Sequence, residues 1–311
     1  MTTTKRFKGL ANQNPAPQSF NIIRVNSQRL LTGQWSPTLG QIFTDPQDLE
    51  TNEQLIERQR DGEDFFLLWD VAKRKAAGIE LTQILPQSGA MYIPWTGVLP
   101  EYRNLGIGAA MTHEIAGHMR QRYGASHTII EAEDPVRLRT SGAYAPDEIE
   151  DAIAVAARRI NFWRRQNFVV VDDNTKPVGE KLSYVRPGSA DDQQIQAYDH
   201  MAVRFHDPAL RDRVMTADGQ ISKAFVRACY FDMNRIQFGK DLTDTQLRDN
   251  YPAIDQYARA IDAIASDTLA TRNEAIIEKT SPTAATTLNV VQEQSIAMMT
   301  AANSKRRAAY N

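Results

Sequence analysis

Residues 98–108 read VLPEYRNLGIG and decide the fold that we expect for this chain. A β-rich run ends at Leu99, and Gly106 and Gly108 stand at the start of a patterned helical segment. Glycine lets a backbone turn tightly and approach a ligand, and the N–H groups of a first helical turn bind phosphate. Arg103 adds a positive charge beside them. The stretch predicts a phosphate-binding loop between a strand and a helix, although a helix start merely capped by glycines is the simpler alternative.

An amphipathic helix is predicted directly after this loop. Apolar residues recur every four positions between Gly106 and Tyr123, which gives a stripe that packs on a sheet. β-rich runs alternate with helical patterns from Phe20 to Phe205, which predicts a mixed α/β fold. The predicted strands are residues 20–25, 65–70, 76–84, 92–99, 128–132, 168–171 and 201–205.

A second helix is predicted from about Asp147 to Gln166. Acidic residues fill its first turn, and Arg164 and Arg165 lie in its last turn, so both ends match the helix dipole. Asn167 then occupies the place where a residue with left-handed backbone ends a helix, and asparagine follows glycine in preference there.

The composition changes after Phe205, where strands are expected to stop. A helix is predicted over 221–238, a longer one from Pro252 to about residue 280, and a last apolar pattern over 288–302. We therefore expect three parts: a polar N-terminal arm at 1–19, an α/β domain at 20–206, and a C-terminal extension at 207–311 that forms a helical hairpin for assembly or interaction.

Charge and cysteine content exclude several classes of protein. The 311 residues carry 36 Lys and Arg against 38 Asp and Glu, a net charge of −2, so nucleic-acid binding is not expected as the main role. Cys229 is the only cysteine, which excludes an internal disulfide and favours a reducing compartment. No apolar run approaches the ~20 residues that span a bilayer. We expect a cytoplasmic protein without a membrane span.

Three motifs together resemble the GNAT superfamily of acyl-CoA N-acyltransferases. Residues 98–108 resemble its pyrophosphate-binding motif A, and Phe162–Phe168 resembles the segment often written F-Y-x-x-x-G-F. Residues 131–135, EAEDP, are similar to the end of the fifth strand in a group of bacterial members. The resemblance extends from about residue 20 to residue 205.

The resemblance implies a mixed GNAT-type sheet, flanked by helices, whose fourth and fifth strands splay apart to admit the pantetheine of acetyl-CoA. It implies direct attack by an amine on the acyl group, with the oxyanion met by a backbone N–H near Val98. The residues that would bind acetyl-CoA, the acyl donor, are Val98, Arg103, Asn104, Leu105, Gly106, Ile107 and Gly108.

The catalytic positions depart from the family pattern. Trp163 stands where many members have a tyrosine that protonates the thiolate, and Tyr92 stands near the place of a carboxylate on the fourth strand. An amine near pKa ~10 must lose a proton before it attacks, so a base or a water relay is needed. The remaining candidates are Glu131, Glu133, Tyr92, Tyr144 and Tyr184, although the residue types alone favour a surface carboxylate or a packed tyrosine for each of them.

Metal and cysteine chemistry are not expected. His113 and His118 are five residues apart and do not share a helix face, so no metal site is predicted. Cys229 lies near Phe225 and Phe231 in a predicted helix and is interpreted as a small buried side chain rather than a nucleophile.

Two functions compete at this stage. The first is an acetyl-CoA-dependent N-acyltransferase that acts on an unidentified amine. The second is a weak or inactive GNAT-fold subunit that binds CoA or serves a structural role in a larger assembly, for example a phage or other virion particle. The extension predicts a homo-oligomer or larger assembly through residues 240–311, with an apolar seam at Ile254, Tyr257, Ile261, Ile264, Leu288, Val291 and Met298.

Overall fold

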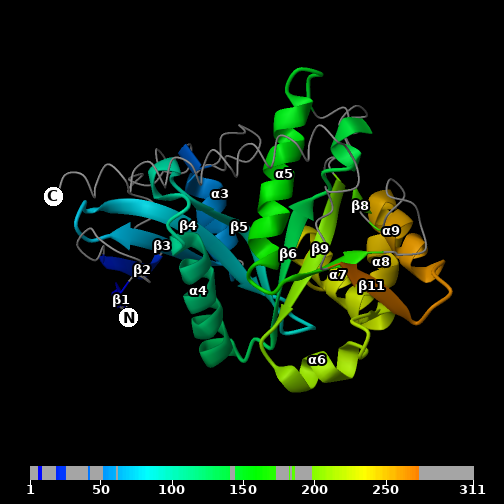
Figure 1. Cartoon of the computed structure of the whole chain (residues 1–311). Helices are drawn as coiled ribbons and strands as arrows, with labels where there is room; N and C mark the ends of the chain where they lie inside the picture. The colour runs from blue at the N-terminus through cyan, green and yellow to red at the C-terminus, as the bar shows by residue number, and fades with distance from the viewer. Residues whose placement is uncertain are drawn as a thin grey trace. The chain divides into compact units, whose positions relative to one another are not determined.

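A computed structural model of the chain describes residues 6–8, 19–25, 41–42, 52–60, 62–140, 144–172, 182, 184–185 and 198–272 (Figure 1). The chain divides into two compact units. The first unit comprises residues 1–131 and 202–250, and the second comprises residues 132–201 and 251–311. Each unit is described by itself.

The first unit is built on a mixed sheet. Its strands pair in the order β1, β2, β3, β4, β5 and β6; every neighbouring pair is antiparallel except β5 and β6, which are parallel. This mixed arrangement was predicted from the resemblance. The strands are β1 (Arg6–Lys8), β2 (Ser19–Val25), β3 (Asp64–Asp70), β4 (Lys75–Ile84), β5 (Met91–Val98) and β6 (His127–Glu133).

Helices cover both faces of this sheet. On one face, Thr82 of β4 contacts Met119 of α4 (Ile107–Tyr123), with 3.8 Å between Oγ1 and Sδ. On the other face, His127 of β6 packs against Phe225 of α7 (Lys223–Phe238). The helix α3 (Asn52–Arg60) also lies on that second face. Because both faces are covered, β4 is buried along almost its whole length.

Shorter elements complete the first unit. A 3₁₀ turn η2 (Pro100–Tyr102) follows β5, and β9 (Tyr198–Phe205) enters this unit at Ala202. The C-terminal part adds α6 (Pro208–Val214), the short strand β10 (Ile221–Ser222) before α7, and α8 (Asp244–Asn250).

The second unit combines helices with short strands. Within it, β11 (Thr268–Arg272) pairs antiparallel with β7 (Val169–Asp172), and β8 (Tyr184–Val185) pairs with β9. The helix α5 (Ile149–Arg164) packs on the turn η3 (Arg137–Thr140) through Leu138, Ile153 and Ala156. Asn167 has φ +64°, so the predicted left-handed end of α5 is confirmed. The remaining helix is α9 (Pro252–Asp262).

The seven predicted strands and the helices at α4, α5 and α7 are confirmed to within a few residues. The N-terminal arm contains the strand β1, because Arg6–Lys8 finds hydrogen-bonding partners on the edge of β2. Two expectations about the C-terminal part are wrong. Strands do not stop at Phe205, since β10 and β11 follow, and the helix that begins at Pro252 ends at Asp262 rather than near residue 280.

The predicted apolar seam of the extension needs a correction. Ile254, Tyr257 and Ile261 are 0%, 2% and 0% exposed in the single chain, so they do not present an exposed surface to a second copy. Ile264 is half-buried. Leu288, Val291 and Met298 lie outside the described residues, as does the last apolar pattern. Oligomerisation and the proposed domain boundaries therefore stay predictions.

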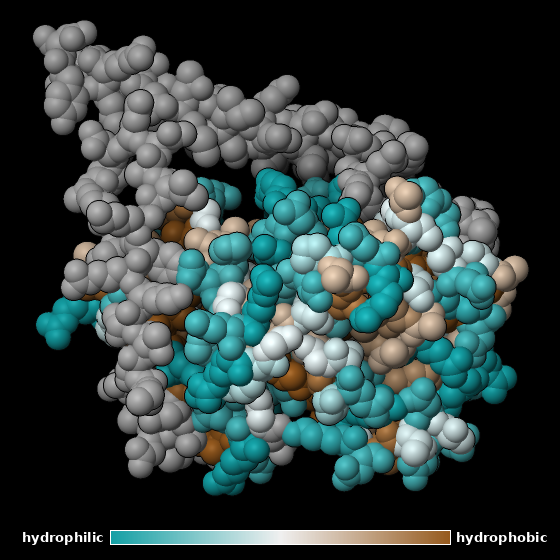
Figure 2. Space-filling model, turned by 90° about the horizontal axis from the view of Figure 1, so that it is seen from below, coloured by the Kyte–Doolittle hydropathy of each residue, from teal (hydrophilic) through white to brown (hydrophobic). Residues whose placement is uncertain are grey.

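The described surface is mixed in character. The face drawn in Figure 2 is largely hydrophilic, with hydrophobic residues in small separate groups. None of the helices in the described ranges is long and apolar enough to cross a bilayer.

The helix α7 is tied to the turn between β4 and β5. The Asp232 carboxylate, which is fully buried, accepts the backbone N–H of Ser88 at 2.7 Å, the N–H of Gln87 at 3.1 Å and the Ser88 hydroxyl at 2.8 Å. A carboxylate that accepts several donors fixes the backbone that carries them. Part of the predicted extension is thus bound to the turn between β4 and β5, the strand that leads to the loop at residues 99–106.

We expect Asp232→Ala to lower the free energy of unfolding by about 3 kcal/mol, because two backbone N–H groups and the Ser88 hydroxyl lose their buried acceptor. Denaturant unfolding of the full chain measures this loss. The control is Asp212→Ala, at an exposed position of α6, which should change the value by less than about 0.5 kcal/mol. Equal unfolding midpoints for wild type and Asp232→Ala would show that α7 is not held through this carboxylate.

Candidate functional site

The parallel strands β5 and β6 pair at three positions and then part. The paired residues are Met91 with Thr128, Tyr92 with Ile129, and Ile93 with Ile130. Beyond Ile93, β5 stays paired with β4 but no longer with β6. The splaying of these two strands was predicted from the resemblance, and it is confirmed here.

A bulge in β5 coincides with this parting point. Opposite β4, Leu81 faces Trp95 and Gln83 faces Tyr92, so β5 has one residue more than β4 in between. The extra length falls at Ile93 and Pro94, and proline, which lacks an N–H, is found within sheets at bulges and edges. From Pro94 to Val98 every residue of β5 is half-exposed.

The parted section of β5 presents backbone groups toward the gap. The N–H of Leu99 donates to the carbonyl of Ala77 on β4 at 2.9 Å. In an antiparallel pair this orientation alternates, so the N–H and C=O groups of Thr96 and Val98 point away from β4 and toward the side that β6 has left. Gly78 of β4 lies opposite Val98. A Cβ at residue 78 would come within 2.8 Å of the Gly97 carbonyl oxygen, so only glycine fits next to this part of β5.

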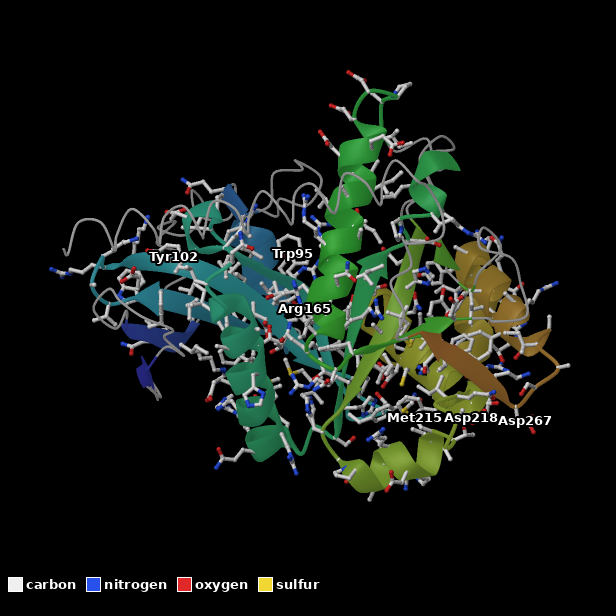
Figure 3. All side chains as sticks on the ribbon, in the orientation of Figure 1. Trp95, Tyr102, Arg165, Met215, Asp218 and Asp267 are labelled. Carbon is white, nitrogen blue, oxygen red and sulfur yellow. The ribbon has the colours of Figure 1, made fainter. Side chains whose placement is uncertain are left out.

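The loop after β5 is anchored by Tyr102 (Figure 3). Its side chain is 1% exposed, and its hydroxyl donates to Asp70 Oδ2 at 2.8 Å. The ring meets Phe20 edge to face at 5.9 Å. Burial raises the pKa of Asp70, but the hydrogen bonds from the Lys73 backbone and from Tyr102 outweigh it and hold that pKa below its usual value. The anchored turn leaves the following residues, 103–106, exposed.

Gly106 is the N-cap residue of α4, and it leaves the N–H groups at the start of this helix without a side-chain cap. Its φ is +75°, a left-handed value that favours glycine, and a Cβ at this position would meet no atom within 4 Å. No side chain caps the helix at Gly106, so the first N–H groups of α4 lack the usual partner. Arg103 is exposed at the rim, where its Nε donates to the Val98 carbonyl at 3.3 Å. Asn104, with φ +63°, and Leu105, 55% exposed, complete the loop before Ile107 and Gly108.

Two of the five predicted catalytic candidates meet beside the parting point. The Tyr92 hydroxyl donates a hydrogen bond to Glu131 Oε2. Both side chains are half-buried, and Glu131 is the next residue of β6 after its last pair with β5. They lie on the sheet face opposite α4, where Trp95 carries the guanidinium of Arg58 above its ring at 5.7 Å.

The other three candidates fall in the second unit. Glu133 accepts Arg159 Nη1 at 2.7 Å and the Tyr144 hydroxyl at 3.5 Å. An arginine partner neutralises a carboxylate and makes it a poorer base. Tyr184 lies in β8 opposite Asp199, and its side chain is outside the described part.

Two further motif residues of the second unit are buried. Trp163 is 7% exposed and packs edge to face with Phe162 and Phe168 at 4.9 and 5.0 Å, which favours a packing role. Asp134 pairs with the buried His200 at 3.4 Å. Burial lowers the pKa of His200, but the neighbouring Asp134 and Asp172 outweigh it and raise that pKa above its usual value.

Sequence reasoning did not single out Glu80 of β4. Its carboxyl is fully buried and accepts the hydroxyls of Thr112 of α4 at 2.7 Å and Thr96 of β5 at 3.0 Å, both on Oε2. Oε1 has no partner among the described residues. Burial raises the pKa of Glu80 to about 7 despite these two hydrogen bonds. A glutamate between the apolar residues Ile79 and Leu81 of a strand was the available signal.

The histidines and the cysteine are placed as follows. Among the described residues no group of three or more His, Cys, Asp or Glu side chains could hold a metal ion. Cys229 is fully buried, with its Sγ at 3.7 Å from His127 Nε2, and burial raises the pKa of its thiol far above the usual range. The thiol is therefore protonated near neutral pH and unsuited to nucleophilic attack.

A comparison with known protein families matches part of the chain. Residues 29–145 match the model of the acetyltransferase (GNAT) family, a match that covers less than half of the chain. The GNAT resemblance of the α/β part is thereby confirmed, and GNAT acetyltransferases use acetyl-CoA or another acyl-CoA as acyl donor. A comparison with curated proteins found no significant match.

Several solved structures are similar to part of the chain. The ribosomal-protein-S18-alanine N-acetyltransferase of Escherichia coli is 14% identical, with a TM-score of 0.39, over 60% of this chain and 94% of that one. A GNAT acetyltransferase of Staphylococcus aureus is 14% identical, with a TM-score of 0.37, over 60% and 98%. A ribosomal L7/L12 α-N-protein acetyltransferase in complex with coenzyme A is 14% identical, with a TM-score of 0.37, over 62% and 96%.

Glu80 predicts a specific pH dependence of stability. Its pKa is about 7 in the folded chain against an ordinary 4.5, so between these values the folded state binds more protons than the unfolded state. Stability then falls as the pH rises through this window, by about 3 kcal/mol in total, and is constant above it. Glu80→Gln should remove this contribution, since its amide oxygen still accepts both threonines.

The measurement is the free energy of unfolding of both proteins at about pH 5 and about pH 8. Relative to wild type, Glu80→Gln should gain stability at the higher pH. Glu114→Gln makes the same charge change at a partly exposed position of α4 and should follow the wild-type pH profile. Parallel profiles for wild type and Glu80→Gln would refute the raised pKa.

Proposed function

We propose that this protein is an acyl-CoA-dependent N-acyltransferase that acts on an amine. The observation that supports it best is the parting of β5 from β6 after Ile93, directly before a loop with an open helix start at Gly106. An elongated donor with a pyrophosphate at one end needs both features. The family match over residues 29–145 supports the same chemistry.

Acyl-CoA would bind along the open edge of β5. The backbone groups of Thr96 and Val98 offer hydrogen bonds to the amides of pantetheine, as an added strand would. The N–H groups at Gly106–Gly108 and the α4 dipole would hold the pyrophosphate, with Arg103 at the rim. Asn104, Leu105 and Ile107 would form the surrounding wall.

The reacting groups would be Glu131 and Tyr92. Glu131 accepts a proton from the ammonium form of the substrate, and the free amine then attacks the acyl carbonyl, which forms the C–N bond. The Val98 N–H would stabilise the oxyanion. As the C–S bond breaks, Tyr92 donates a proton to the CoA thiolate and is reprotonated through Glu131, and the second amine proton leaves to solvent.

Gly106→Val combined with Gly108→Val should abolish CoA binding, because the added side chains occupy the place of the pyrophosphate. Isothermal titration calorimetry with CoA measures this loss. The matched control is Gly117→Val with Gly124→Val, since Gly124 ends the same helix with φ +74° and also has open space around it, so it carries equal backbone strain. Undiminished CoA affinity in a folded Gly106→Val/Gly108→Val protein would remove the loop from the proposal.

A single charge should matter less than the two glycines. Arg103→Ala should weaken CoA binding by about 1–2 kcal/mol, as expected for one exposed, charge-assisted contact. The same calorimetric titration measures it. A change below about 0.3 kcal/mol would place Arg103 outside the binding site.

Turnover should depend on Glu131 and Tyr92 and not on Trp163. With acetyl-CoA and a panel of primary amines, including diamines, lysine and short peptides, release of CoA thiol measures activity. We expect Glu131→Gln to reduce kcat about a hundredfold with CoA affinity unchanged, and Glu133→Gln, its neighbour on the same strand face, to have a much smaller effect. Trp163→Phe should retain most activity. CoA binding without turnover on any amine would favour the structural alternative.

A further inference from the structure

Cationic side chains gather at the end of the first unit where β9 finishes. Arg204 of β9 donates through Nη2 to His113 Nδ1 of α4 at 3.2 Å. His206 lies two residues on, with its Nε2 at 2.6 Å from the Thr128 hydroxyl of β6. Arg120 lies on the same stripe of α4 as His113, two turns further along. These residues are the terminal cation cluster.

No carboxylate balances this cluster within the described residues. Arg204 is half-buried, and its hydrogen-bonding partner is a ring nitrogen rather than an acid. Burial lowers the pKa of Arg204, with no acidic neighbour acting against it. Asp207, the acidic residue next to His206 in the chain, accepts the Ala209 N–H at 3.0 Å as the N-cap of α6. Partial burial of a guanidinium group costs free energy when no anion lies beside it.

The charges of the cluster act on one another. Burial, followed by the charges of Arg204, Arg120 and His113, lowers the pKa of His206 to about 4. His206 is therefore neutral near pH 7, and its environment is positive. An anion that entered here would gain two guanidinium partners and would favour the protonated form of His206.

We propose that the terminal cation cluster is a binding site for a phosphate group carried by a small molecule. Arg204 and Arg120 provide guanidinium N–H donors that match phosphate oxygens, and the His206 ring provides a further donor. A dianionic phosphate would offset the two arginine charges. The net charge of −2 offers no wider field for a nucleic-acid chain, which favours a small ligand.

The site is separate from the proposed CoA site. Arg120 lies thirteen residues after Ile107, the first residue of α4, which corresponds to about 20 Å along the helix axis. The backbone N–H groups of His206 and Asp207 donate to the Ser126 carbonyl, at 2.9 and 3.0 Å. These hydrogen bonds hold the end of β9 next to the start of β6 (Figure 1). The proposal therefore does not depend on acyl transfer.

The test uses the full chain with inorganic phosphate as the probe, in low-chloride buffer. Titration followed by NMR of the histidine ring protons should give saturable binding and raise the apparent pKa of His206 by at least one unit. Arg204→Gln should weaken phosphate binding at least tenfold. Arg204→Lys keeps the charge but not the planar guanidinium, so its phosphate affinity should lie between those of wild type and Arg204→Gln. Circular dichroism verifies that each variant is folded.

Two controls make the result specific. Arg122→Gln removes an exposed arginine of the same helical turn whose guanidinium lies over Tyr123, outside the cluster, and should leave phosphate binding unchanged. Arg204→Gln should leave CoA affinity unchanged. Equal phosphate affinity in Arg204→Gln and Arg122→Gln, or no phosphate binding by wild type, would overturn the proposal. So would an oligonucleotide that binds the cluster more tightly than phosphate, since the ligand would then be a nucleic acid.

Discussion

The structure depends on one constraint: beyond Ile93 and Pro94, β5 cannot stay hydrogen bonded to both of its neighbouring strands. Up to Ile93 it is hydrogen bonded to β4 on one side and β6 on the other. Pro94 cannot donate a hydrogen bond, and the extra residue of the bulge turns β5 relative to β4. Beyond this point β5 stays hydrogen bonded to β4 but not to β6. The backbone groups of Thr96 and Val98 are therefore left at an open edge. A sheet normally protects such an edge, and its exposure here is the basis of the proposed binding site.

The neighbouring elements hold this opening in shape. Tyr102 binds the loop after β5 to Asp70 of β3, and Glu80 joins β5 to α4 through Thr96 and Thr112. Asp232 of α7 fixes the turn that leads into β5. Each tie is a buried polar group that secures backbone next to the gap. The site is therefore rigid on the β4 side and bounded by Glu131 and Tyr92 on the β6 side.

The helices and strands that a local sequence pattern marks were predicted from the sequence. Periodic apolar residues predicted α4, α5 and the seven main strands, and Asn167 marked the end of α5. The strands β1, β8, β10 and β11 were missed, because their few residues acquire strand form only through partners elsewhere in the chain. The same reason explains the wrong helix after Asp262, where apolar spacing continued but pairing with β7 decided the outcome. Glu80 and the terminal cation cluster were not identified, since a carboxylate or arginine shows its surroundings only once the sheet is assembled.

Hydrogen exchange of the full chain with and without CoA tests the central claim most directly. The account predicts that CoA slows exchange of the amides of Thr96 and Val98, on the open edge of β5, and of the first turn of α4 after Gly106. Trp95 and Gly97, whose N–H groups face β4, should exchange at the same rate in both states. Unchanged exchange at Thr96 and Val98 under saturating CoA, or protection confined to other parts of the chain, would contradict the account.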